Sequence, residues 1–372
     1  MKYQFTLSLL LFFLSTTLIA QEQQEKLDTI KTGANTLLFL VNLPKAKTAN
    51  SLYNHIKVID QRSDTATLGF LDVSSDNGIK IIIPGYPLHQ QFSKLLTTLT
   101  DSAAGNGELL LQVNRFSFSS FIKPYSQAAY YYLRLRLYGK TGNGYSQLAF
   151  LDTSVKVNFG NIFKSNFYKR IFINCSETLT NFLTANITNS PSLLSHIYSL
   201  TDVMNIVGIE KSVIPVYISD TLKNGIYKSF ISFKNQLPDT STKYQLHFKK
   251  GKLSTVERKT TYKNESGDLV NASIEIPGET FYAIVDKGKA YIFSQSGFYS
   301  LQKREGDFYF TEQINESSDL WNITPLNGLG HQAFGGVGAL VTALATLGPN
   351  KSLFEMKIDY LTGVFIPTKK IE

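Results

Sequence analysis

The spacing of apolar residues in the first half of the chain predicts strands interrupted by two amphipathic helices. Apolar residues recur every three or four positions across 88–103 and 161–189, which is the helical period. Shorter apolar or alternating runs predict strands over 36–43, 56–60, 68–73, 79–83, 108–118, 127–138 and 145–159. The Gly- and Asn-rich stretch 139–144 should join the last two strands as a hairpin, and 193–207 is expected to form a shorter helix.

The second half has a different pattern, in which short apolar runs flank turns that contain glycine. Three pairs of runs follow this pattern: 243–248 with 252–260, 281–285 with 290–294, and 298–302 with 308–313. Each pair predicts a β-hairpin. We therefore expect an α+β protein, with a mixed α/β domain over 36–205 followed by a mostly antiparallel β-meander domain over 212–372.

Residues 1–20 have the pattern of a secretory signal peptide. Lys2 precedes an apolar stretch that is short for a membrane span, and a polar run follows Ala20. An uncleaved N-terminal anchor is the less favoured alternative. Residues 21–35 then form a leader or linker, so we expect an exported protein that is periplasmic or outer-membrane-associated.

Charge and cysteine content narrow the classes of function. The net charge is +8, but the basic residues are dispersed, so we expect no nucleic-acid partner and at most mild attraction to an anionic surface. The single cysteine, Cys175, cannot form an internal disulfide and lies in an apolar helical pattern, which favours burial. Because Gln21 follows the predicted cleavage site, we do not expect a lipoprotein.

Residues 130–138 carry the most suggestive pattern for binding. Strand alternation places Leu133, Leu135 and Leu137 on one face. The other face carries the tyrosines and arginines that are enriched in binding hot spots, namely Tyr130, Tyr132, Arg134, Arg136 and Tyr138. An envelope protein, a glycan or an anionic lipid surface could contact this face. The alternative, which the pattern favours, is that the face packs under a helix with its guanidinium groups reaching outwards.

A second candidate is the apolar, glycine-rich segment 333–347. It is short for crossing a bilayer, but it could insert shallowly or pack against copies of itself. The residues that would make this membrane or self-contact are Gly335, Gly336, Gly338, Leu340 and Leu344. A buried segment is the favoured alternative.

Catalytic and metal-binding chemistry has little support in the sequence. The histidines are scattered singly, so no metal site and no cofactor are expected. No nucleophile-elbow or zinc-protease motif occurs, and a non-enzymatic role is favoured over an enzymatic one. Asp60 and Arg62 point the same way on a predicted strand. They could contact a partner, but a structural ion pair is the favoured interpretation.

The element order of the first half, with its V-x-D-x-R stretch at 58–62 and Leu68-Gly69, resembles the α/β domain of envelope transport-auxiliary and curli-secretion lipoproteins. The second half resembles uncharacterised secreted Gram-negative envelope proteins, through 225–230, 288–292 and 357–363. These resemblances imply a secreted envelope protein with an accessory or binding role. The alternatives are a membrane-associating or oligomer-forming component acting through 333–347, and a hydrolase acting on envelope polymers.

Overall fold

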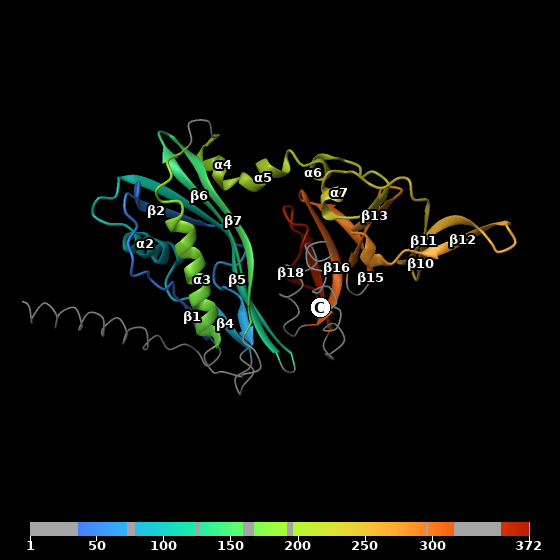
Figure 1. Ribbon diagram of the computed structural model, residues 1–372, viewed down its shortest axis with the longest axis horizontal. Helices are drawn as coiled ribbons and strands as arrows, with labels where there is room; N and C mark the ends of the chain where they lie inside the picture. Colours follow the sequence, from blue (N-terminus) through green and yellow to red (C-terminus); the bar gives the residue numbers. More distant parts are fainter. Residues whose placement is uncertain are drawn as a thin grey trace, which may run out of the picture.

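The computed structural model describes residues 36–72, 79–123, 126–158, 167–191, 196–294, 297–315 and 351–371. Within these residues the chain is α+β and rich in strands, which confirms the predicted fold class (Figure 1). The predicted signal peptide, the leader over 21–35 and the apolar segment 333–347 lie outside the described residues.

A five-stranded sheet forms the centre of the first half, in the order β2-β5-β6-β7-β8. β2 is parallel to β5, and the other neighbours are antiparallel. The strands are β2 (Tyr53–Asp60), β5 (Gly107–Lys123), β6 (Ser126–Thr141), β7 (Gly144–Asn158) and β8 (Ile197–Tyr198). The hairpin predicted between β6 and β7 is confirmed. Its turn is tighter than 139–144, because Gly142 adopts a positive φ of 52° between the two strands.

Two helices cover one face of this sheet, α2 (Leu88–Leu99) and α3 (Phe167–Thr184) (Figure 1). A small sheet in the order β1-β4-β3 lies beside them, formed by β1 (Thr36–Phe39), β4 (Ile79–Pro84) and β3 (Phe70–Asp72). The core between helices and sheet contains Phe39, whose ring lies 5.2 Å from those of Phe116 and Phe172. Cys175 is fully buried in the same core, as its sequence pattern predicted.

The predicted helix over 193–207 is wrong at its start. Ile197 and Tyr198 pair with β7 as strand β8 instead. The helix begins only after Ser199, whose hydroxyl accepts a hydrogen bond from the Asp202 N–H while the Asp202 carboxylate accepts one from the Ser199 N–H. This capping box fixes the start of α4 (Leu200–Met204), and α5 (Ile206–Lys211) follows it.

The second half is built on a seven-stranded antiparallel sheet in the order β18-β17-β16-β15-β14-β13-β9. Its strands are β9 (Gly225–Tyr227), β13 (Ala283–Asp286), β14 (Lys289–Ser294), β15 (Gly297–Arg304), β16 (Asp307–Asn315), β17 (Lys351–Ile358) and β18 (Phe365–Lys370). The inner face of this sheet packs on the short helices α6 (Pro215–Ile218) and α7 (Phe230–Lys234). The hairpins predicted over 281–294 and 298–313 are both present.

A separate three-stranded sheet lies across the outer face of the seven-stranded sheet and extends away from it (Figure 1). Its strands are β10 (Tyr244–Lys249), β11 (Lys252–Lys263) and β12 (Leu269–Glu275), and a 3-10 turn (Gly278–Thr280) follows it. A small cluster that includes Leu253, Val256 and Phe281 joins the two sheets. The hairpin predicted over 243–260 is therefore confirmed.

Candidate functional site

The alternation along β6 divides its side chains as the sequence predicted. Leu133, Leu135 and Leu137 are at most 1% exposed and pack in the core with α2 and α3. The opposite face carries Tyr130, Tyr132, Arg134, Arg136 and Tyr138, which are at most 7% exposed. That face is turned towards α4, α5 and the second half of the same chain, and its contacts are with these elements. The contact with another molecule that the sequence suggested stays a prediction.

Arg134 joins the two halves through a buried ion pair. Its guanidinium donates to both carboxylate oxygens of Asp359, at 2.7 and 3.0 Å, and to Asp152 at 2.8 Å. Burial alone would raise the pKa of Asp359, but Arg134 and the backbone N–H of Thr362 hold that pKa down to about 2. Asp359 is therefore ionised, and its attraction to Arg134 is part of what holds the halves together.

Arg136 makes a second set of contacts beside the first. Its guanidinium donates to both oxygens of Glu210 at 2.7 Å and to the hydroxyl of Tyr360 at 3.3 Å. The Tyr360 hydroxyl in turn donates to Glu210. At the end of the face nearest α4, Tyr138 packs with Val203 in a small apolar cluster. Arg134, Arg136 and Tyr138 thus have partners in elements that follow β6 in the sequence, whereas Tyr132 lies against Arg115 of the preceding strand β5.

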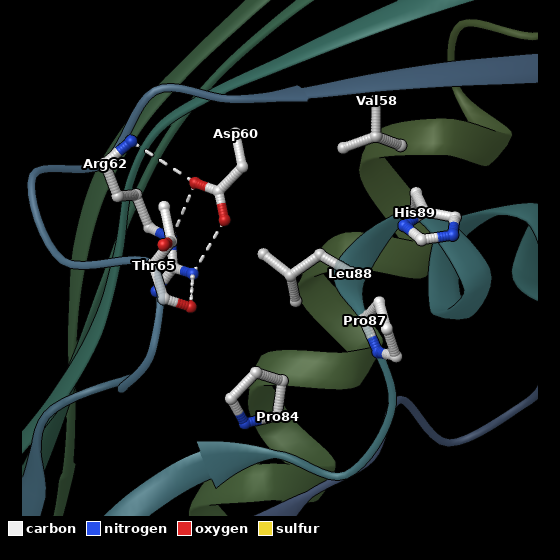
Figure 2. Close-up of a pocket in the computed structure, with 8 residues that line it drawn as sticks. All are labelled: Val58, Asp60, Arg62, Thr65, Pro84, Pro87, Leu88 and His89. Atoms are coloured by element: carbon white, nitrogen blue, oxygen red, sulfur yellow. Dashed lines mark hydrogen bonds and ion pairs between the residues drawn. The ribbon is translucent and has the colours of Figure 1, made fainter.

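Asp60 and Arg62 form the structural pair that the sequence favoured. The guanidinium of Arg62 donates to both carboxylate oxygens of Asp60, at 2.9 and 2.7 Å, and to the carbonyls of Thr65 and Thr67 (Figure 2). These bonds close the loop after β2. A cavity of about 180 Å³ lies beside the pair, and His89 lies at its other side, away from the two charged groups (Figure 2). The pair is engaged within the loop and offers little to a ligand.

A larger hollow lies on the outer face of the seven-stranded sheet, and we call it the outer groove. Its volume is about 780 Å³. One wall is the turn residue Gly251 with the start of β11 at 252–254, and the floor comes from β14, β15, β16 and β17. The side chains that point outwards from these strands into the groove are Tyr291, Phe298, Ser300, Gln302, Tyr309, Thr311, Gln313, Leu353 and Glu355.

The local sequence explains why these side chains face the groove. Phe308, Phe310 and Glu312 alternate with Tyr309, Thr311 and Gln313 along β16, and the first three are buried on the inner face. The alternation over 308–313 predicts this strand, but it does not mark the outward residues as a site. The feature of the sequence that could reveal the groove is the mixture of aromatic and uncharged polar residues at the outward positions of β16. A solvated strand face usually carries charged residues instead.

The described residues hold no group of three or more His, Cys, Asp or Glu side chains placed to bind a metal ion. Likewise, no helix in the described ranges is long and apolar enough to span a bilayer. The self-contact residues Gly335, Gly336, Gly338, Leu340 and Leu344 lie outside those ranges.

No family model matches the chain, and no curated protein matches it in sequence. Among solved structures, it is similar to protein XCC0632 from Xanthomonas campestris, family-model DUF330, at 11% identity with a TM-score of 0.28. That match covers 40% of this chain and 95% of the other. An uncharacterized protein matches at 14% identity and a TM-score of 0.18, over 39% of this chain and 96% of the other. TM-scores this low carry no argument about function, and the resemblance to envelope lipoproteins stays a prediction.

Proposed function

We propose that this chain is an exported accessory protein of the cell envelope that binds an envelope component in the outer groove, without catalysis. The observation that carries this proposal is the groove itself, which is large, open and lined by aromatic and uncharged polar side chains. Binding sites combine apolar surface with a few polar groups that fix orientation in this way. The signal-like pattern of residues 1–20 supports the location.

The chemistry of the groove favours binding over hydrolysis. Glycoside hydrolysis generally requires two carboxyl groups on either side of the scissile bond. The described lining contains one carboxylate, Glu355, and no histidine. The Arg304 guanidinium holds this carboxylate at 2.7 Å. Among the described lining residues, Glu355 is thus a single carboxylate, and Arg304 engages it.

A sedimentation assay tests the binding role. Purified protein is mixed with isolated cell envelopes, and the bound fraction is measured for the wild type and for Thr311→Arg, which places a long charged side chain in the groove. We expect the variant to bind at least about tenfold more weakly, because the long arginine side chain would occupy space in the groove that the ligand needs. Tyr262→Ala is the matched control, since Tyr262 is an exposed β11 residue outside the groove lining.

Equal sedimentation of Thr311→Arg and the wild type would contradict the proposed site. Retention that survives Thr311→Arg but disappears when 333–347 is deleted would favour the alternative of a membrane-associating component. Cell fractionation tests the location separately. Full-length, unprocessed chain in the cytosol would contradict export.

A further inference from the structure

We infer that the ligand of the outer groove is an uncharged glycan chain. This inference rests on the proposed function and names the chemical class that the groove would take. Three observations carry it: unused hydrogen-bonding groups on the floor, aromatic surface beside them, and a balance of charge that suits a neutral ligand.

The floor and wall present five uncharged side chains that can both donate and accept hydrogen bonds, namely Ser254, Ser300, Gln302, Thr311 and Gln313. All five are exposed. None of these side chains makes a hydrogen bond within the described part of the chain. Sugar hydroxyls also donate and accept, so amide and hydroxyl side chains are suited to pair with them in either direction.

Aromatic rings lie among these polar groups. The strand register places Tyr309 directly between Gln302 on β15 and Lys357 on β17, and places Tyr291 beside Ser300. The Arg304 guanidinium lies 4.3 Å from the centre of the Tyr309 ring, which restrains that ring, and Tyr291 packs against Phe248. Tyrosine rings beside hydrogen-bonding groups match a sugar ring, which has apolar C–H faces and a polar rim.

The charge of the groove argues against an anionic ligand. The chain as a whole carries a net charge of +8. The charged lining residues of the groove are Lys252 and Glu355, one of each sign. The cations beside the lining, Arg304 and Lys357, are paired with Glu355 and Asp307. The other lysines of the β10–β11 turn, Lys249 and Lys250, are not among the lining residues. An anionic polymer or lipid surface would be recognised by clustered unpaired cations, and the described lining contains one lysine, Lys252.

A printed array of neutral and anionic glycans, together with proline-rich peptides, tests the inference. Neutral glycans should bind the wild-type protein, and raising the salt concentration should change this binding little, because no charge is being screened. The best neutral glycan is then titrated by calorimetry against Gln302→Ala and Thr311→Arg. Each variant should lower the affinity by roughly tenfold or more, and Tyr262→Ala should leave it unchanged.

The outcomes separate this inference from the proposed function. If Thr311→Arg abolishes sedimentation with envelopes but no neutral glycan binds, or only anionic glycans or peptides bind, the glycan inference is overturned while the binding role stands. If a neutral glycan binds equally to the wild type, Gln302→Ala and Thr311→Arg, the glycan lies elsewhere and the inference is also overturned. If Thr311→Arg sediments like the wild type, both proposals fail.

Discussion

The carboxyl group of Glu312 is buried in an apolar environment. It lies on the inner face of β16 in line with Phe308 and Phe310, and it is 0% exposed. Neither of its carboxylate oxygens has a hydrogen-bond partner among the described residues. Burial raises its pKa to about 7, although the nearby Ser294 hydroxyl acts in the opposite direction. Near pH 7 roughly half of the folded molecules therefore hold a proton that the unfolded chain has released.

This carboxylate should make stability depend on pH, and Glu312→Gln should remove the dependence. Between its unfolded pKa of 4.5 and its folded pKa of about 7, wild-type stability falls as pH rises. The variant should therefore be more stable than the wild type by up to about 3 kcal/mol near pH 8, and nearly equal to it near pH 4. Urea unfolding at the two pH values measures both differences. A difference that does not change with pH would contradict the raised pKa.

The turn between β17 and β18 depends on one glycine. Gly363 has a φ of +76°, and a Cβ built on it would lie 2.2 Å from the Cγ atom of Phe230. Its N–H donates to the carbonyl of Asp359 at 2.8 Å, and the Asp359 N–H donates to Val364 at 2.7 Å. The turn therefore holds Asp359 where Arg134 can reach it.

Gly363→Ala should destabilise the protein through both its backbone and its packing. We expect a loss of roughly 2–4 kcal/mol, because left-handed backbone strain adds to the clash with Phe230. Gly251→Ala is a matched control, since Gly251 has the same φ of +76° and no described atom lies within 4 Å of the place that its new methyl group would take. That control should lose only about 1 kcal/mol. Thermal or urea unfolding compares the two, and equal losses would show that the Phe230 contact has no effect.

The elements show what local patterns could and could not predict. Alternation assigned the two faces of β6 correctly, because a period of two is a property of neighbouring residues. It could not identify the partner of Arg134, since Asp359 lies 225 positions away. The outer groove was missed for the same reason, because its floor and its β11 wall come from separate parts of the chain. At Ile197 and Tyr198, pairing with β7 prevailed over the apolar pattern that had favoured a helix.

At the scale of the whole molecule, charged contacts link the two halves and the α5 segment between them. Arg134 pairs with Asp359, Arg136 with Glu210, and Lys211 with Asp307. A buried ion pair stabilises a structure weakly when it is compared with apolar residues, but removing one partner leaves an uncompensated charge. The association of the halves therefore depends on both members of each pair being present.

Arg134→Met and Arg115→Met should have unequal effects on stability. Arg134→Met leaves Asp359 buried without its cation and should cost roughly 3–5 kcal/mol. Arg115 lies 4.8 Å from the centre of the Tyr132 ring, and no described carboxylate forms a salt bridge with it. Burial lowers its pKa, so Arg115→Met should cost about 1 kcal/mol or less. Urea unfolding measures both, and a smaller loss for Arg134→Met than for Arg115→Met would contradict this account of the junction.

The burial of Cys175 has a practical consequence. Its side chain is 0% exposed, and burial raises the pKa of its thiol well above the usual value. Alkylating reagents should therefore leave it untouched in the native fold. A cysteine placed at Thr311 would then be the single reactive thiol, so a fluorescent dye could be attached inside the groove without first deleting the natural one.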